Sequence, residues 1–459
     1  MNNLMQFSDR FWNTSCRVIA EMEARGVTLD VDYLEHKREL ALEEVSELEA
    51  RLDRWAEDYT RQTECPMNWA SPTQLAAFLY HFKCYPISPV KGSLNATKRN
   101  TKREETTSEA ALDWLARNTK SDTDREYLET LLRSRKTAKL AQFMESLCSM
   151  VSVDGRLRSS FGPNTDTGRL SSSNPNMQNV PTRNDRFGIR KAFIPAPGKL
   201  LVVADYSQLE MYVLAHFLIH ELDDHSLAND LSSGDVHSAM AFRIWPDELR
   251  AIGATPDNIK EVAKSYRGNA KTVNYAVPYG KTASGLGSQI KGANGKGIGK
   301  KAAQQILDDY FEACPGLDEL FETWRNNARQ TGFTHTLLGR TRPLPGAASD
   351  DQWVRWAAER RAVNTQVQGS AADIVTAAMM ACVGVGPTSK QKPLAAELAS
   401  LGGKMLMQVH DELMFEVPAG NAERCCAIIK EIMENPFDKP LAVQLVVDAE
   451  IGRSWGAAK

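Results

Sequence analysis

The sequence lacks several features that would assign the protein to a specialised class. It contains no run of about 18 apolar residues, so no segment is expected to span a membrane. Its N-terminus, MNNLMQFSDRFWNTSCR, has no apolar core of the kind found in secretory signals. None of the 8 cysteines belongs to a CxxC pair, and their spacing shows no disulfide framework. We therefore expect reduced thiols in a cytosolic protein.

What the sequence does contain is an ordinary globular balance. Its 459 residues are 42% hydrophobic and 25% charged, a composition that excludes a disordered or fibrous chain. At roughly 100–200 residues per domain, this length allows about three domains. The formal net charge is −3, so any contact with nucleic acid must come from local basic patches rather than from the molecule as a whole.

Two stretches have helical periodicity. In the first, one apolar stripe is made of residues spaced seven, four, three, four and three apart: Leu34, Ala41, Val45, Leu48, Leu52 and Trp55. This stripe predicts a long amphipathic helix packed within its own domain. An intermolecular coiled coil is the alternative, disfavoured because few heptads are present. A second helical pattern covers about 123–149 and has four cations in its middle: Arg133, Arg135, Lys136 and Lys139.

Two basic stretches are predicted loops. Residues 88–103 contain Gly, Ser, Asn and Thr between their cations and no acid. The cations are Lys91, Lys98, Arg99, Lys102 and Arg103. Such a loop is either simply solvated or contacts phosphates. Residues 291–301, KGANGKGIGKK, fit no P-loop frame and are predicted to be a flexible basic insertion of unknown function.

Two acids stand at the ends of apolar runs. The run KLLVVAD predicts a buried strand that ends at Asp205, and KMLMQVH and LMFEV predict a β-hairpin whose turn holds Asp411 and Glu412. A half-buried acid is costly unless it is paired or bound to a metal. If the fold joins Asp205 and Asp411, they could hold hard divalent cations for phosphoryl transfer. Spacing alone leaves salt bridges and turns as the alternative.

A third pattern lies in YRGNAKTVNYAVPYG at 266–280. Arg267, Lys271, Tyr275 and Tyr279 are four apart, so they share one face of a predicted helix. Two cations one turn apart suit a triphosphate, and the aromatic rings could stack on a base. The alternative is an exposed basic stripe with two core tyrosines. Pro278 indicates that a regular helix does not continue past it.

Taken together, six segments resemble family A (polymerase I-like) DNA polymerases, and they occur in the right order. They are TGRLSSSNPNMQNVP (167–181), DYSQLEMYVLAH (205–216), RGNAKTVNYAVPYG (267–280), LLGRTRPLP (337–345), ERRAVNTQVQGSAADI (359–374) and QVHDELMFEV (408–417). The resemblance runs from about residue 15 to GRSW at 452–455. It implies an α+β, right-hand polymerase fold with an antiparallel palm sheet and helical fingers and thumb.

The resemblance also implies an order of domains. It gives an N-terminal palm-associated segment (1–30), a thumb (31–152), a palm piece with the first catalytic motif (153–221), fingers (222–369) and a palm piece with the second catalytic motif (370–459).

The activity implied is template-directed DNA synthesis, in which dNTPs are added to a primer 3′-hydroxyl and pyrophosphate is released. Asp205, Asp411 and Tyr206 would hold two Mg²⁺ ions, for which Mn²⁺ could substitute. Glu412 would support them, and Lys271 could protonate the departing pyrophosphate.

Further matched positions imply substrate contacts. Those expected to bind the incoming nucleotide are Arg267, Lys271, Tyr275, Tyr279, Glu210, Gln208 and His410. Those expected to contact DNA are Arg169, Asn179, Arg360, Asn364 and Gln368. Donors in the minor groove can test the shape of a base pair without reading its sequence. Glu210 matches the family's steric gate against a ribose 2′-hydroxyl, and Tyr275 matches a position where a tyrosine favours dideoxynucleotide incorporation.

The sequence also departs from the family pattern. Tyr212 stands where the family usually has Arg, Ala276 and Pro278 alter the nucleotide-binding helix, and the 291–301 loop is longer than usual. No exonuclease domain precedes the match, so we expect a polymerase without 3′–5′ proofreading, of phage or plasmid origin.

The expected partners are primer-template DNA, dNTPs, a processivity factor, a helicase or primase, and a separate exonuclease, in the cytoplasm or nucleoid and without a membrane. Two alternatives remain open. One is a non-catalytic primer-template binding protein, disfavoured by the intact Asp205, Asp411, Arg267 and Lys271. The other is a single-subunit RNA polymerase or primase, disfavoured by Glu210.

Overall fold

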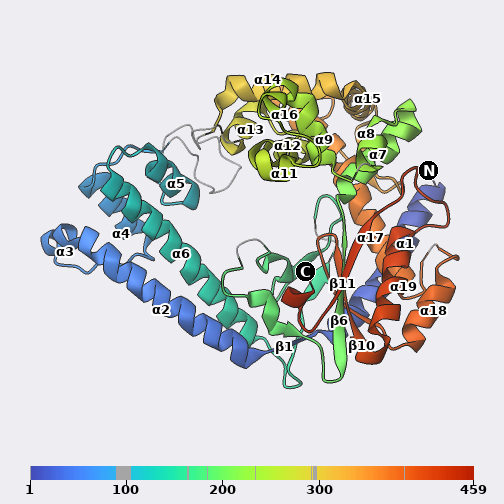
Figure 1. Ribbon diagram of the computed structural model, residues 1–459, viewed down its shortest axis with the longest axis horizontal. Coiled ribbons are helices and arrows are strands. Elements are labelled where there is room, and N and C mark those ends of the chain that lie inside the picture. The colour runs from blue at the N-terminus through green and yellow to red at the C-terminus, as the bar shows by residue number, and fades with distance from the viewer. Residues whose placement is uncertain are drawn as a thin grey trace. The chain divides into compact units, whose positions relative to one another are not determined.

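The computed structural model describes residues 2–88, 105–162, 165–182, 185–232, 234–290, 292, 297–386 and 388–458. The chain divides into two compact units. Unit 1 comprises Met1–Val27, Arg158–Asn179 and Ile194–Lys459, and unit 2 comprises Thr28–Leu157 and Val180–Phe193. Figure 1 labels most of their helices. No helix in the described part of the chain is both long and apolar enough to cross a bilayer.

Unit 2 is built on two long helices that pack against each other, α2 (Val31–Trp55) and α6 (Asp122–Ser149). The Asp30 carboxylate caps α2 by accepting from the Tyr33 N–H, and the Ser121 hydroxyl caps α6 in the same way. The buried residues of α2 are Leu34, Ala41, Leu52 and Trp55. Both predicted helices are therefore confirmed, and the apolar stripe of the first faces a helix of the same chain.

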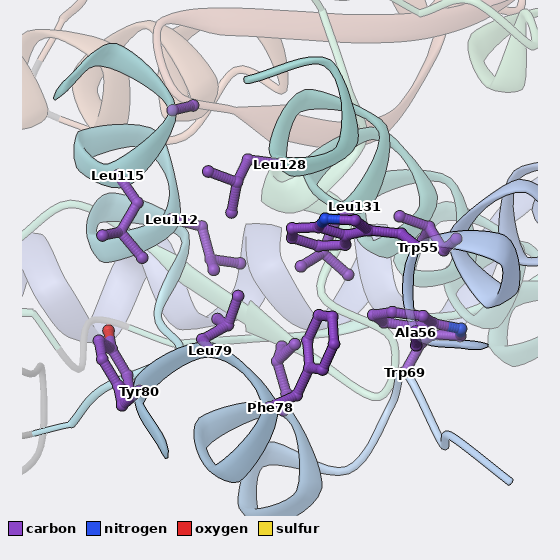
Figure 2. Close-up of a cluster of buried hydrophobic side chains, with 13 residues drawn as sticks. Trp55, Ala56, Trp69, Phe78, Leu79, Tyr80, Leu112, Leu115, Leu128 and Leu131 are labelled. Atoms are coloured by element: carbon purple, nitrogen blue, oxygen red, sulfur yellow. The ribbon is translucent and has the colours of Figure 1, made fainter. Parts of the chain in front are cut away.

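One end of unit 2 encloses an aromatic core (Figure 2). Short helices complete it: α3 (Glu57–Thr63), α4 (Pro72–Ala76), η1 (Ala77–Phe82) and α5 (Glu109–Asn118). The Trp55 ring stacks on Tyr127 with centroids 5.1 Å apart and meets the edge of Phe78 at 4.9 Å. Unit 2 also contains β2 (Arg156–Leu157) and η3 (Ile189–Ala192), and most of β1 (Val27–Leu29). The strands pair in the order β2-β1-β5, and the boundary between the units falls within β1 and within β5 (Phe193–Ile194).

Unit 1 contains a four-stranded antiparallel sheet of order β11-β6-β10-β9. Its strands are β6 (Lys199–Tyr206), β9 (Lys404–Val409), β10 (Glu412–Pro418) and β11 (Val447–Gly452). Helices α1 (Asn2–Arg25), α17 (Ser370–Cys382) and α19 (Ala422–Glu434) lie beside this sheet, and α18 (Lys392–Ser400) packs on the last two (Figure 1). Buried Val202, Val203 and Phe415 form part of the core. The predicted strand and hairpin are confirmed.

The rest of unit 1 is mainly helical. Between the sheet strands the chain forms α7 (Leu209–Leu222), α8 (Ser226–Ser232), α9 (Val236–Ile244), α10 (Pro246–Ala251), α11 (Ile259–Val262), α12 (Lys264–Ala276), α13 (Ala283–Gln289), α14 (Gly299–Ala313), α15 (Pro315–Thr331) and α16 (Gln352–Asn364). The π-helical η4 (Thr365–Gly369) joins α16 to α17. Unit 1 also contains two small hairpins. They are β3 (Ser160–Gly162) with β4 (Ser171–Ser173), and β7 (Phe333–His335) with β8 (Thr341–Pro343). Three short 3-10 helices complete the unit: η2 (Met177–Asn179), η5 (Ala419–Asn421) and η6 (Trp455–Ala457).

Three local predictions can be compared with these elements. Helix α12 ends at Ala276, before Pro278, as predicted. The basic loop at 88–103 lies outside the described residues except for Ser88. The loop predicted for 291–301 was wrong at its end, because Gly299–Lys301 form the first turn of α14, where the good helix formers Lys300 and Lys301 lead into an amphipathic pattern. Residues 291 and 293–296 lie outside the described part.

Candidate active site

The two predicted aspartates lie on neighbouring strands of the unit 1 sheet. Strand β10 pairs antiparallel with β6 so that Glu412 stands opposite Asp205, and Asp411 is in the turn immediately before β10. The Tyr206 N–H donates to the Asp411 carbonyl oxygen over 3.2 Å. Residues far apart in the sequence are thus neighbours at one end of the central strand pair.

Asp411 is in an electrostatically crowded position. Burial raises its pKa to about 6, and the nearby Glu210 and Asp205 carboxylates act in the same direction, while Arg169 opposes them. The Arg169 Nη2 atom lies 3.9 Å from the Asp411 carboxylate, but it is closer to Glu210, at 2.6 Å. A carboxylate that is costly to ionise next to other carboxylates favours a bound cation.

The donor set around this turn fits a hard divalent cation. Mg²⁺ is commonly held by one or two carboxylates, with water and substrate phosphates completing its shell. Asp205 and Asp411 supply the carboxylates. The Tyr206 hydroxyl is buried and donates to the Met433 carbonyl over 2.6 Å, so only the Tyr206 backbone carbonyl is a candidate ligand. No cluster of three or more His, Cys, Asp or Glu side chains suited to a metal occurs within the described ranges.

Glu412 faces a different partner. Its side chain is buried, and its Oε1 atom accepts a hydrogen bond of 2.6 Å from Nε1 of Trp455 in η6. Glu412 therefore fixes the turn against the C-terminal segment of the sequence, which is a supporting position beside Asp411.

A second group of predicted residues forms one hydrogen-bonded network around Glu210. Glu210 is in the first turn of α7 and is only 4% exposed. Its Oε1 atom accepts from Arg169 at 2.6 Å and from the Tyr279 hydroxyl at 3.0 Å. Burial, together with the Glu210 charge, raises the pKa of Tyr279 to about 12, while a hydrogen bond from Gln368 acts against the rise. Tyr279 is thus a neutral donor that helps to fix the Glu210 carboxylate.

The cations of α12 lie one turn apart, as their spacing predicts. The Arg267 guanidinium binds Asp235 side-on, with Nε and Nη2 donating at 2.8 and 3.2 Å. Although burial acts in the opposite direction, hydrogen bonds from Arg267 and Ser238 hold the pKa of Asp235 well below its usual range. Within the residues that the structure describes, Nη1 of Arg267 takes no part in this pair. The Lys271 Nζ atom lies 5.9 Å from the Tyr275 ring centroid.

The structure also brings to this site residues for which no role was predicted. His237, at the start of α9, lies with its ring centroid 5.6 Å from that of Tyr275. Burial and the charges of Lys271 and Arg267 lower its pKa to about 4, so the imidazole is neutral at pH 7. Its Nδ1 atom lies 3.0 Å from Nδ2 of Asn274. The signal available in the sequence was the helix start in GDVHS, where Asp235 is the N-cap.

Two predicted nucleotide contacts stand in left-handed backbone. Gln208 has φ 51° in the turn between β6 and α7, and His410 has φ 56° in the turn between β9 and β10. Left-handed conformations are uncommon for residues other than glycine, and they concentrate at functional sites. Gln208 Oε1 is buried without a hydrogen-bond partner among the residues that the structure describes, and His410 is exposed.

Three of the predicted DNA contacts follow one line along α16 and η4. The Arg360 stem covers Gly280, where an added Cβ would lie 2.5 Å from Arg360 Cγ. Asn364 follows one turn later, and Gln368 reaches Tyr279. Asn179 is exposed at the end of η2 and makes none of these contacts within the described ranges.

Arg340, in the predicted segment LLGRTRPLP, ties together the backbone beside Arg169 and Gln368. Its guanidinium donates to the Asp373 carboxylate at 3.0 Å and to the carbonyl oxygens of Thr167 at 2.6 Å and Gly369 at 3.2 Å. Gly168 has φ 80°, which other residues rarely adopt, and a Cβ there would displace the Arg340 guanidinium, whose Cζ atom would lie 2.5 Å away. Arg340 therefore positions two of the predicted DNA contacts.

The fold and the site define a class of protein. The structure is similar to the POL domain of Pol1 from M. smegmatis, solved in complex with a DNA primer-template and dNTP, with a TM-score of 0.79 and 32% sequence identity. This similarity covers 97% of the present chain and 70% of that chain. The α+β, right-hand polymerase fold expected from the sequence is confirmed.

The chain belongs to DNA polymerase family A, whose sequence profile matches residues 38–457. It is 37% identical to the thermostable DNA polymerase I of Thermus filiformis over 448 residues, which are 96% of this chain and 47% of that protein. It is 35% identical to DNA polymerase I of Mycobacterium tuberculosis, covering 96% of this chain and 44% of that protein. The chain thus spans about half the length of these relatives.

Proposed function

We propose that this chain is a DNA-directed DNA polymerase, which adds dNTPs to the 3′-hydroxyl of a primer. The observation that carries the proposal is the juxtaposition of Asp205 and Asp411 at the end of β6 and β10, beside the network around Glu210. The proposal is supported by membership of family A and by the structural similarity to a domain solved with primer-template and dNTP.

The carboxylates of Asp205 and Asp411, with the Tyr206 carbonyl, would hold two Mg²⁺ ions, and Mn²⁺ could substitute. When bound, these ions supply activation of the primer hydroxyl and neutralisation of phosphate charge. Glu412 keeps the turn in place through its bond with Trp455. The Nη1 side of Arg267 and the Lys271 ammonium bind the triphosphate, and Lys271 gives a proton to the departing pyrophosphate.

Selection of the sugar follows from the way Glu210 is held. Arg169 and Tyr279 both fix its Oε1 atom, so the carboxylate cannot swing aside to admit a 2′-hydroxyl. Gln208, in the turn after β6, and His410, in the turn before β10, contact the nucleotide and the primer end. The Tyr275 hydroxyl would replace a missing 3′-hydroxyl, so dideoxynucleotides should compete well with dNTPs.

The primer-template is contacted by residues of the α16 line and of the segment before β6: Arg169, Asn179, Arg360, Asn364 and Gln368. In this proposal residues 31–152 form the thumb, 222–369 the fingers, and 1–30, 153–221 and 370–459 the palm. The protein works in the cytoplasm with a processivity factor, a helicase or primase and a separate exonuclease. We also predict that the protein does not remove mismatched primer ends by 3′–5′ exonuclease activity.

The test is extension of a labelled primer with Mg²⁺, in dNTPs or in NTPs, by the wild type, Asp411→Ala and Glu210→Ala. We expect extension with dNTPs only, a loss of at least about 1,000-fold in Asp411→Ala, and NTP use in Glu210→Ala. The matched control is Asp448→Ala, an exposed acid opposite Asp205 on the other neighbouring strand, which should stay active. Tight primer-template binding without extension by the wild type would instead support the non-catalytic alternative.

A further inference from the structure

Two tryptophans stand exposed at the start of α16. The side chains of Trp353 and Trp356 are 65% and 40% exposed, and their rings meet edge to face with centroids 5.3 Å apart. A pair of large aromatic side chains left in water is unusual unless it serves binding.

The position of the pair on the helix connects it to the candidate site. Trp353, Trp356, Arg360 and Asn364 are spaced three, four and four residues apart, so they lie on one face of α16. Gln368 follows in the π-helical η4, close enough to Tyr279 to lower the pKa of its hydroxyl. The Arg360 side chain covers Gly280, the residue that follows Tyr279 in the sequence. The aromatic pair is therefore the outer end of this stripe, with Trp356 about 6 Å and Trp353 about 10 Å along the helix from Arg360.

The charges near the two tryptophans indicate whether phosphates or bases of a nucleic acid would bind there. The Arg355 guanidinium is engaged with the Ser349 carbonyl at 2.7 Å and lies 3.8 Å from Glu359. Asp350 and Asp351 flank the helix start, and the latter caps it through the N–H groups of Trp353 and Val354. These acids disfavour phosphates at this end, whereas the exposed ring faces offer stacking surfaces for bases.

We propose that Trp353 and Trp356 form a stacking platform for unpaired bases of the template strand ahead of the site. The inference rests on the proposed function, because it takes the stripe of Arg360, Asn364 and Gln368 as the contact with the primer-template. The platform receives single-stranded template without sequence preference, since every base presents a π-face.

The test compares two primer-templates that share one duplex and differ only in the template overhang, of about one or about ten nucleotides, with binding measured by fluorescence anisotropy. The proposal expects Trp353→Ala/Trp356→Ala to bind the long overhang about tenfold more weakly and the short one unchanged. The Trp353→Phe/Trp356→Phe variant should keep most of the affinity. Val354→Ala, which alters an exposed side chain of the same helix, is the matched control and should change neither.

A second arm needs no variant. A long overhang of abasic nucleotides keeps the phosphates but removes the bases, so the wild type should bind it about as weakly as the short overhang. Equal binding of the abasic and normal overhangs would overturn the platform, as would equal losses on both overhangs in the double alanine variant. A change of oligomeric state in that variant, with its overhang preference intact, would also overturn it.

The two proposals fail in different ways. If the wild type extends no primer but still prefers the long, base-containing overhang, the platform stands and the polymerase activity does not. If extension is normal and the preference is absent, only the platform is wrong.

Discussion

The aromatic core of unit 2 and the candidate site of unit 1 are built from opposite kinds of interaction. In the core, apolar rings bury one another, and the polar ends of Trp55 and Trp69 have partners in Asp124 and Asp53. In the site, charged groups are brought together. Several buried polar atoms there have no hydrogen-bond partner in the described ranges: Arg169 Nε, Gln208 Oε1, Glu210 Oε2 and Asn364 Oδ1.

This difference shows where the molecule gains stability and where it loses it. Burial of apolar rings stabilises a fold, whereas an unpaired buried polar atom costs about 1–3 kcal/mol. A site that keeps such atoms is prepared for substrate groups rather than for its own stability. Substitutions in the two regions should therefore separate stability from activity.

The largest expected effect is on the core. Phe78→Ala removes a fully buried ring that packs on Trp55, Tyr59 and Trp69, and should lower the free energy of unfolding by about 3–5 kcal/mol. Urea unfolding monitored by tryptophan fluorescence measures this loss. Val153→Ala, at a fully exposed position of the same unit, is the control and should change the free energy by less than about 0.5 kcal/mol. A loss below about 1 kcal/mol in Phe78→Ala would show that this core contributes little.

The next largest effect is a gain in the free energy of unfolding, expected when Asp411 is replaced. Raising the pKa of Asp411 from an ordinary value near 3.9 to about 6 corresponds to about 3 kcal/mol of stability lost when the carboxylate ionises. Without metal, Asp411→Asn should therefore be more stable than the wild type at pH 8, by up to this amount. The wild type should lose stability from this group as the pH rises from about 4 through about 6, and the variant should not.

Urea unfolding at several pH values in EDTA measures both quantities. Asp448→Asn, on the neighbouring strand, is the control and should not gain stability. An Asp411→Asn variant less stable than the wild type at pH 8 would contradict the cost assigned to this carboxylate.

The same carboxylate should make metal binding depend on pH. Because Mg²⁺ needs the ionised form, protons compete for Asp411 below about pH 6, and the Mg²⁺ concentration for half-maximal extension should rise about tenfold from pH 7 to pH 5. Magnesium titrations of primer extension at these two pH values measure the change. If the Mg²⁺ concentration for half-maximal extension does not vary with pH, Asp411 does not bind the metal.

The smallest effect concerns the support of Arg267. Asp235→Asn weakens the side-on pair that orients the guanidinium, so KM for dNTPs should rise about fivefold while kcat changes little. Asp230→Asn, which alters a separate ion pair with Arg243, is the matched control. If KM fell in Asp235→Asn, Asp235 would be a competitor of the triphosphate rather than its support.

The sequence predicts the local parts of this architecture well. Apolar runs identify β6 and the β9–β10 hairpin, and the apolar stripe identifies α2, because strand and helix periodicity depend on near neighbours. The resemblance to family A correctly gives the fold. The roles assigned to site residues stay predictions, although the structure brings most of those residues together.

What could not be predicted depends on contacts between distant segments. Nothing near Glu210 in the sequence indicates that Arg169 and Tyr279 share one of its oxygens. Likewise, Arg340 becomes significant only when Thr167 and Gly369 approach it, and His237 only when α9 packs beside α12. Such contacts are set by tertiary packing, which periodicity does not report.

The order of strands in the unit 1 sheet has a consequence for biosynthesis. Strand β6 is translated first but occupies an interior place, between β11 and β10, both of which come from the far end of the sequence. While the ribosome is still adding the intervening helices, β6 has neither neighbour, and an apolar strand with two open edges invites pairing with other nascent chains. Asp205 therefore gains Asp411 beside it only after the chain has been extended through the intervening helices to β10.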